Sequence, residues 1–219
     1  MTPAIIIPVL NPPDTFTNLI QSIRNVVSIP IIIVDDGTKP AVHITSEFTN
    51  IKLLRNNINQ GKGYSLIKGI HYAFIQGYTH AITLDADSQH DPSIIPDFLD
   101  MDENISIVCG RRSFNGSMPL HRRFSNIITS LILSFICNKK LFDSQCGYRR
   151  YRLQDVCAET FTETGFQFET EVLIKLLRNE LNISHINIPT IYADETSSIL
   201  HFQDTLIFIR LVIRTFLKI

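Results

Sequence analysis

The chain has 219 residues, of which 44% are hydrophobic and 19% charged, and its formal net charge is −1. This length suits one compact domain, and the apolar content is enough for a core, which excludes a largely disordered chain. A net charge so close to zero gives no sign of a nucleic-acid-binding protein.

The cysteines and the first residues bear on location. The four cysteines form no CxxC pair and show no metal-finger spacing, so we expect reduced thiols. The chain enters an apolar run without a basic leader, which predicts a cytoplasmic protein without a signal peptide. No apolar run reaches the roughly 20 residues of a membrane-spanning helix, so we expect contact with a membrane surface at most.

Strand and helix patterns alternate in the first half of the chain. Four short apolar runs rich in β-branched residues predict buried strands: 4–10, 29–34, 51–55 and 81–84. Apolar residues recur at helical spacing in residues 16–23 and 61–77. This alternation predicts an α/β fold with a mainly parallel sheet flanked by helices.

After residue 88 the pattern is less regular. Extended segments are predicted over residues 105–110 and 183–192, and helices over residues 124–136, 167–178 and 205–218. No repeat, linker or low-complexity tract divides the chain. We therefore expect one domain over residues 1–219, with two halves at 1–100 and 101–195 and a C-terminal amphipathic helix at 203–219.

Polar residues follow three of the predicted strands. They are Asn11 after the first strand, Asp35 and Asp36 after the second, and Asp85 and Asp87 after the fourth. In parallel sheets covered on both faces, ligands bind at the carboxyl ends of the strands. The sequence therefore predicts a binding site at this edge of the sheet.

The Asp85-Ala86-Asp87 motif indicates a cation. Residues 85 and 87 point to the same side of an extended chain, and two adjacent carboxylates are costly unless a cation neutralises them. Oxygen ligands select hard cations such as Mg²⁺ or Mn²⁺. A turn with a helix N-cap is the alternative interpretation, but the strand before the motif favours a metal site.

Four segments, in this order, resemble glycosyltransferase family 2: Ile-Ile-Pro-Val-Leu-Asn (6–11), Ile-Val-Asp-Asp-Gly-Thr (33–38), Asn-Gln-Gly-Lys-Gly (59–63) and Leu-Asp-Ala-Asp-Ser-Gln-His-Asp-Pro (84–92). Residues 111–112, 121–125 and 143–149 resemble the dolichyl- or polyprenyl-phosphate hexose synthase branch. The resemblance covers roughly residues 4–195. It implies a GT-A fold and inverting transfer, with a nucleotide-sugar-binding first half and an acceptor-binding second half.

The resemblance also implies a nucleotide pocket. Pro8 and Asn11 begin this pocket, and Asp36, together with Asp35, contacts the base or ribose. One departure is Pro12, because family members usually have Glu there. The base contact normally made at that position must therefore change.

For the metal site, the resemblance implies that Asp87 is a ligand, that Gln89 lies close by, and that Asp85 lies near the sugar or ribose. We count Asp85 among both the metal ligands and the catalytic candidates. Lys62 lies in Gly-Lys-Gly without a P-loop pattern. We expect the glycines to bring the helix start close to the sheet, and Lys62 to lie near the nucleotide or in solvent.

Positive charge is concentrated downstream. Between Arg111 and Arg152 there are nine Lys and Arg residues and a single acid, Asp143. This segment favours an anionic partner, with a solvated basic face as the alternative. In the resembled branch the anion is a lipid phosphate, for which Arg111, Arg122 and Arg123 are the predicted ligands.

Two helices have open interpretations. The helix at 124–136 either lines the path of the lipid or packs in the core. The basic residues Arg210, Arg214 and Lys218 of the last helix suit a membrane surface, docking on the sheet or a dimer contact. Glu169 and Glu171 open a helix, where acids suit the helix dipole.

The resulting hypothesis is a transferase that moves a hexose from a UDP-glucose- or GDP-mannose-type donor to a polyprenyl or dolichyl phosphate. Asp143 is the candidate base or acceptor-positioning group. The alternatives are a family 2 enzyme that acts on a sugar hydroxyl and a catalytically silent nucleotide-binding subunit. We place the protein in the cytoplasm or peripherally on the cytoplasmic face of a membrane; the sequence does not predict its oligomeric state.

Overall fold

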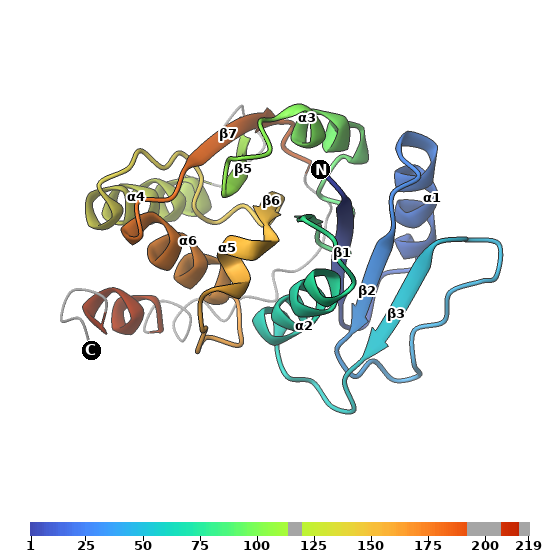
Figure 1. Cartoon of the computed structure of the whole chain (residues 1–219). Coiled ribbons are helices and arrows are strands. Elements are labelled where there is room, and N and C mark those ends of the chain that lie inside the picture. Colours follow the sequence, from blue (N-terminus) through green and yellow to red (C-terminus); the bar gives the residue numbers. More distant parts are fainter. Residues whose placement is uncertain (114–119, 192–206, 215–219) are drawn as a thin grey trace.

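The computed structural model describes residues 1–113, 120–191 and 207–214, with the side chains of 120–122 left out. Residues 207–214 are helical. The other elements are β1 (Pro3–Val9), α1 (Phe16–Val26), β2 (Ile31–Asp35), β3 (Ile51–Arg55), α2 (Lys62–Ile75), β4 (His80–Thr83), the 3₁₀ helix η1 (Pro92–Ile94), α3 (Ile95–Asp100), β5 (Ile107–Arg112), α4 (Leu120–Cys137), β6 (Arg149–Arg152), α5 (Leu153–Cys157), α6 (Phe168–Arg178) and β7 (Ile183–Ile188) (Figure 1).

The strands form one seven-stranded sheet in the order β3-β2-β1-β4-β6-β5-β7. β1 is parallel to β2 and β4, β2 to β3, and β5 to β7, whereas β6 is antiparallel to both of its neighbours. The predicted mainly parallel sheet is therefore confirmed. The carboxyl ends of β1, β2 and β4 lie at one edge, where the predicted site residues follow them.

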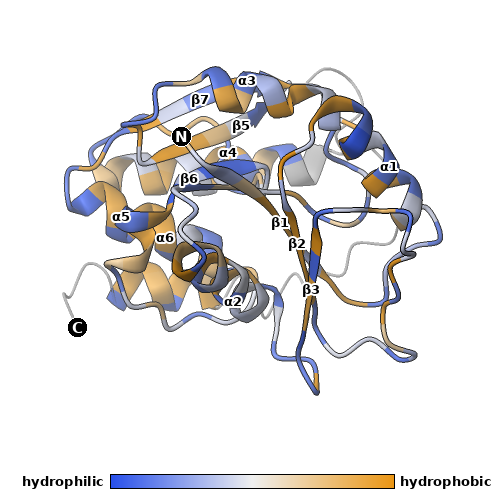
Figure 2. Cartoon of the chain, turned by 45° about the vertical axis from the view of Figure 1, so that its right-hand side comes forward, coloured by the Kyte–Doolittle hydropathy of each residue, from blue (hydrophilic) through white to orange (hydrophobic). Residues whose placement is uncertain are grey.

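Both faces of β1 are buried, which explains its uninterrupted apolar sequence. Ile5 and Ile7 pack in one core with the apolar side chains of α1 and α3. Ala4 and Ile6 point to the other face and pack with α2, α5 and α6. Figure 2 shows the apolar character of β1 and β2 along their length.

β6 is a strand that the sequence pattern did not predict. Its sequence is Arg-Arg-Tyr-Arg, yet Arg149 and Arg150 are fully buried in the middle of the sheet. The guanidinium of Arg150 donates to the carbonyl oxygens of Phe98, Met101 and Asp102 at 2.6–3.1 Å. Burial is tolerated because the backbone satisfies the charge, an arrangement that residue type alone does not reveal.

α4 has an inverted polarity. Asn126 and Ser130 are buried, whereas Phe124, Leu131 and Phe135 are 67%, 64% and 79% exposed. The predicted amphipathic helix is thus present, but most of its apolar residues face outward. Ordinary core packing does not explain this face.

The C-terminal helix is described only over residues 207–214, so Lys218 lies outside the described residues. Leu211 is buried and Phe208 packs beside it, while Ile207, Ile209 and Ile213 are exposed. The described part is therefore docked on the core.

None of the helices in the described residues has the length and apolar character needed to cross a membrane.

Candidate active site

The Asp85-Ala86-Asp87 motif forms a tight turn directly after β4. The backbone N–H of Gln89 donates to Asp87 Oδ1 at 3.0 Å, and Ser88 adopts a left-handed conformation with φ of 61°. The backbone N–H of Asp85 donates to His90 Nδ1 at 3.1 Å. These bonds fix the two carboxylates at the carboxyl end of a central strand.

His90 is a neutral support of this turn. It is buried and stacks on Tyr148 with a centroid separation of 4.9 Å. Burial, aided by the charge of Lys62 and opposed by that of Asp85, lowers the pKa of His90 to about 4. Because Nδ1 accepts the backbone N–H, the ring proton is assigned to Nε2.

Lys62, the first residue of α2, bridges two carboxylates. Its Nζ lies 2.7 Å from Asp85 Oδ1 and 3.4 Å from Glu169 Oε2. Burial alone would lower the pKa of Lys62, but the two carboxylates raise it overall. Burial alone would raise the pKa of Asp85, but nearby positive charge, above all that of Lys62, lowers it overall. Lys62 is therefore a charged, paired side chain and not a solvated one.

Gly147 lies at the centre of these three side chains. A Cβ at Gly147 would lie 2.8 Å from Glu169 Oε1, 3.1 Å from Asp85 Oδ2 and 3.1 Å from Lys62 Nζ. No side chain fits there without displacing the charged groups. We refer to Lys62, Asp85, Glu169 and Gly147 as the Lys62 cluster.

The glycines beside Lys62 bring α2 against the segment before α6. A Cβ at Gly63 would lie 2.5 Å from Phe168 Cβ, and one at Gly61 would lie 2.5 Å from the Thr164 carbonyl oxygen. The Tyr64 N–H donates to that same carbonyl at 3.0 Å. The two glycines themselves contact residues 164–168, and this contact places Lys62 beside Glu169. Further along α2, Leu66 packs in one core with Ile6 of β1, so the helix also lies on the sheet.

Arg149 holds the second half of the cluster in place. Its fully buried guanidinium donates to the carbonyl oxygens of Cys146 (2.7 Å), Ser144 (2.8 Å) and Glu169 (2.7 Å). One planar group thus ties the loop that carries Gly147 to the first turn of α6.

Asp35 and Asp36 order the loops after β2. Asp35 is enclosed and accepts from the Thr38 N–H at 2.9 Å and from Arg55 at 2.6 Å. Asp36 accepts from the Gly61 N–H at 2.8 Å, directly before Lys62. The structure therefore connects Asp36 to the Lys62 cluster through the start of α2, and it shows both carboxylates engaged by the protein itself.

Asn11 and Pro8 lie at the end of β1. The backbone N–H of Asn11 donates to Thr38 Oγ1 at 3.0 Å, its φ is 47°, and its side chain is exposed. Pro8 is buried and lies beyond Ile6, the last residue of β1 that pairs with β4. The loops after β1 and β2 are thus joined at the predicted edge.

Asp143 is held by several donors. Arg112 binds it through Nε at 2.7 Å and through NH2 at 3.0 Å, and Asn126 of α4 donates at 2.9 Å. Burial would raise the pKa of Asp143, but its bonds to Arg112 and Asn126 lower it. A carboxylate stabilised in this way is a weak base, so the arrangement supports a positioning role and gives no support to proton abstraction.

The basic residues of the second half are not one exposed surface. Arg149 and Arg150 are buried, and Arg112 is paired with Asp143. Arg111 is exposed and stacks on the Phe142 ring, with its Cζ 4.1 Å from the centroid.

The other two predicted phosphate ligands are on α4. The side chain of Arg123 is exposed, and that of Arg122 lies outside the described residues.

The described residues offer a divalent cation two carboxylates and no larger set of protein ligands. Within the described ranges, no group of three or more His, Cys, Asp or Glu side chains is arranged to hold a metal ion. Mg²⁺ typically takes one or two carboxylates and completes its shell with waters and substrate phosphates, a requirement that Asp85 and Asp87 can meet.

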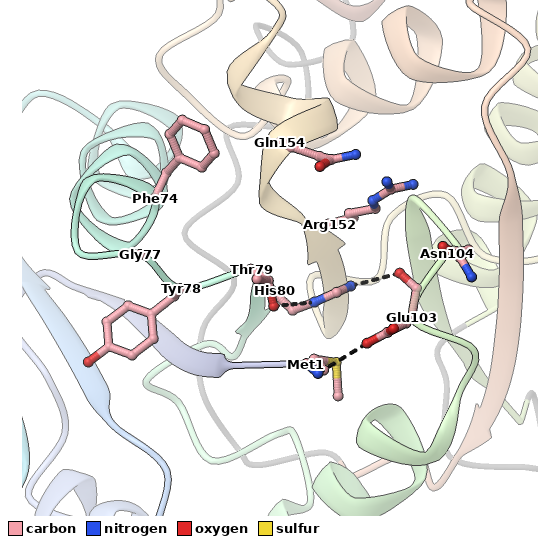
Figure 3. A pocket seen from close by; sticks show the side chains of 10 residues that line it. All are labelled: Met1, Phe74, Gly77, Tyr78, Thr79, His80, Glu103, Asn104, Arg152 and Gln154. Carbon is pink, nitrogen blue, oxygen red and sulfur yellow. Dashed lines mark hydrogen bonds and ion pairs between the residues drawn. The ribbon is translucent and has the colours of Figure 1, made fainter.

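A separate pocket of about 360 Å³ lies at the opposite ends of the strands, where β1 and β4 begin. It is lined by residues that include Met1, Thr79, His80, Glu103 and Arg152 (Figure 3). His80 bridges Thr79 and the Glu103 carbonyl at 2.9 Å each. None of the predicted site residues lines this pocket.

Three residues of the site were not predicted from the sequence. The place of Glu169 at a helix start already explains an acid there, and Gly147 and Arg149 lie in the 143–149 segment, in which the sequence indicates a role for Asp143 alone. The signal that marks Gly147 is its place between Cys146 and Tyr148, inside the motif that resembles the polyprenyl-phosphate branch.

Comparisons with known proteins identify similar sequences and a similar fold. The chain is 28% identical to UDP-N-acetylglucosamine–dolichyl-phosphate N-acetylglucosaminyltransferase of Methanococcus voltae (87% of this chain, 86% of that protein) and 24% identical to undecaprenyl-phosphate mannosyltransferase of Micrococcus luteus (79% and 76%). These names match the branch that the motifs resemble.

The fold matches that of glucosyl-3-phosphoglycerate synthase from Mycobacterium tuberculosis, crystallised with Mn²⁺, UDP and glucosyl-3-phosphoglycerate. The TM-score is 0.71 at 17% identity, over 99% of this chain and 79% of that chain. The predicted GT-A fold is thus confirmed. The family model of glycosyl transferase family 2 matches residues 4–161, which is well over half of the sequence. The chain therefore belongs to glycosyl transferase family 2.

Proposed function

We propose that this chain is an inverting glycosyltransferase that moves a hexose from a nucleotide-sugar, of the UDP-glucose or GDP-mannose type, to a polyprenyl or dolichyl phosphate. The observation that supports a lipid-linked acceptor is the outward apolar face of α4. A water-soluble acceptor gives this face no partner, whereas a lipid supplies one. The relatives named as dolichyl-phosphate and undecaprenyl-phosphate transferases support the same acceptor.

The donor lies, in this proposal, along the carboxyl edge of β1, β2 and β4. Asn11 and the loop ordered by Asp36 line the nucleotide side, and Asp85 and Asp87, with Gln89 nearby, hold Mg²⁺ or Mn²⁺. A bound divalent cation supplies charge stabilisation for the diphosphate leaving group.

The acceptor needs no dedicated base. A phosphate oxygen, already ionised at neutral pH, attacks the anomeric carbon as the bond from that carbon to the nucleoside diphosphate breaks. The product of an α-linked donor is then a β-linked sugar phosphate. Asp143 serves this step indirectly, because it binds both Arg112 and Asn126 and so fixes α4 beside β5.

Exposed cations surround the proposed acceptor path. The stacking of Arg111 on Phe142 uses the face of the guanidinium, which leaves its N–H edge for a phosphate. Arg123 at the start of α4 and Lys139 and Lys140 just after its end are exposed. With the apolar face between them, these residues suit a peripheral position on an anionic membrane surface.

The test is incubation of the protein and Mg²⁺ or Mn²⁺ with UDP-sugars and GDP-mannose and a short polyprenyl phosphate. The matched control is the corresponding polyprenol, which has the same chain but no phosphate. We expect nucleoside diphosphate release and a lipid product with the phosphate alone, and loss of both in Asp87→Asn. If no donor gives a lipid product, the proposal fails; transfer to sugar hydroxyls, or donor binding without turnover, would establish one of the alternatives instead.

A further inference from the structure

Within the Lys62 cluster, the ammonium of Lys62 lies closer to Asp85 than to Glu169. Lys62 Nζ is 2.7 Å from Asp85 Oδ1 but 3.4 Å from Glu169 Oε2. The other oxygen of Glu169, Oε1, is buried and has no hydrogen-bond partner among the residues that the structure describes. A buried carboxylate oxygen without a donor is unfavourable, so Glu169 has unused capacity for a cation.

Gly147 leaves the route between the two carboxylates open. The position of its absent Cβ lies 3.1 Å from Lys62 Nζ and 2.8 Å from Glu169 Oε1. Any larger residue would stand between the ammonium and the unpaired oxygen. Arg149 binds the Glu169 carbonyl and the loop before Gly147, which keeps both ends of this route fixed.

In the structure Lys62 competes with any other cation for Asp85. An ammonium at 2.7 Å opposes a divalent ion at the same carboxylate, because like charges at such distances repel strongly in a partly buried site. If the donor and its cation take Asp85, Lys62 needs a second anion within reach of its flexible side chain. Glu169 is that anion.

We infer that Glu169 is a positioning residue that takes over the Lys62 ammonium when the donor and its divalent cation engage Asp85. This inference rests on the proposed function. Lys62 is then a built-in counter-ion that neutralises Asp85 in the free protein and shifts towards Glu169, whose Oε2 already lies 3.4 Å from Nζ. The rival is that Lys62 follows the diphosphate of the donor, as expected for a residue near the nucleotide.

A double-mutant cycle on binding tests this without any turnover. Mn²⁺ with UDP is titrated calorimetrically into the wild type, Lys62→Met, Glu169→Gln and the double variant. We expect Glu169→Gln to weaken binding about tenfold, because Lys62 then stays on Asp85, and to have no effect in the Lys62→Met background. Lys62→Met alone should not weaken binding. Glu171→Gln, on the same helix but bonded to Lys175 and Thr162, is the matched control and should leave Mn²⁺–UDP affinity unchanged.

Each other outcome has a defined meaning. An equal effect of Glu169→Gln in both backgrounds would assign Glu169 a structural role and overturn the inference. Weaker binding by Lys62→Met would show that Lys62 follows the diphosphate. A wild type that binds no Mn²⁺–UDP, Mg²⁺–UDP or GDP would overturn the proposed function itself, whereas a binding wild type with an additive cycle overturns only this inference. A structure of the complex should show Lys62 Nζ bonded to Glu169 and released from Asp85.

Discussion

The part of the sheet built on β1–β4 and the part built on β5–β7 bury polar groups in different ways. In the first part, apolar strands fill the core, and the buried carboxylates lie at or just after the end of a strand, where backbone N–H groups donate to them, as at Asp35 and Asp36. In the second part, the interior strand β6 buries two arginines, and α4 turns polar residues inward and apolar residues outward.

This difference teaches that polarity predicts position only where a group has no specific partner. Arg149 is buried because three carbonyl oxygens are arranged around it. Phe135 is exposed although its side chain is apolar and forms no favourable interaction with water. The first part follows the general solvation rule, whereas the second departs from it at positions next to the proposed acceptor site.

The largest expected effect is the loss of the Arg149 clamp. Arg149→Lys keeps the charge, but one ammonium cannot span the three carbonyl oxygens that the planar guanidinium reaches. We expect a loss of about 3 kcal/mol or more in the free energy of unfolding, measured by urea denaturation. Arg152→Lys, on the same strand with a loose 3.9 Å pair to Asp155, should cost about 0.5 kcal/mol or less. Similar losses of unfolding free energy in both variants would show that the three hydrogen bonds of Arg149 do not stabilise the fold more than the partly exposed Arg152 does.

The first part of the fold could be predicted because β1, β2 and β4 are buried on both faces and therefore have apolar sequences, whereas the edge strand β3 is more exposed and gives a weaker pattern. β6 could not, since Arg-Arg-Tyr-Arg has neither an apolar run nor an alternation that singles out a core face. The period of α4 was predicted correctly from residues 124–136, but periodicity gives a stripe without saying whether protein or lipid covers it.

The candidate site shows the same limit. Asp85, Asp87 and Lys62 belong to motifs that are local in the sequence, so the resemblance reached them. Glu169 meets Lys62 across 107 positions, and only the fold brings α6 to the start of α2. No local pattern distinguishes an acid that caps a helix dipole from one that also binds a distant lysine.

The next effect concerns the contact between α4 and β5. Asp143→Asn removes the charge that binds Arg112 and should cost about 2 kcal/mol at neutral pH. Because the folded-state pKa of Asp143 is lowered, its contribution is fully present above the unfolded value of about 4 and is lost as the pH falls through the folded value. The difference between wild type and variant should therefore be constant from about pH 5 to 8 and shrink in stronger acid.

Urea denaturation across this pH range measures the effect, with Asp100→Asn, at an exposed position, as the control. A difference that persists undiminished in strong acid would show that the Asp143 charge is not what stabilises the contact.

The outward face of α4 gives a smaller energy but a clear binding test. Leu131→Glu with Phe135→Glu should lower sedimentation with phosphatidylglycerol-containing vesicles at least about tenfold, because two apolar anchors become anionic. Stability should change by less than about 1 kcal/mol, since both positions are exposed. Ile75→Glu, at a 77% exposed position on α2, is the matched control and should bind as the wild type does.

Unchanged vesicle binding by the double variant would remove the membrane from the proposal. A wild-type dimer that the double variant dissociates, seen by light scattering, would instead make this face an interface between two copies.

The smallest expected effect compares one histidine from each part. His185 on β7 packs edge-on against Phe142, with centroids 5.0 Å apart, and burial, with Arg111 and Arg149, lowers its pKa to about 4. The folded protein therefore disfavours the protonated ring, so stability should fall as the pH drops from about 6.5 towards 4. Allowing for partial exposure, the loss is about 1 kcal/mol. His185→Phe keeps the ring contact and should reduce this pH dependence in urea titrations, whereas a variant of the exposed His71 on α2, His71→Gln, should not. An equal response of both variants would mean that burial and the charges of Arg111 and Arg149 do not lower the pKa of His185. The electrostatic difference between the two parts would then not extend to β7.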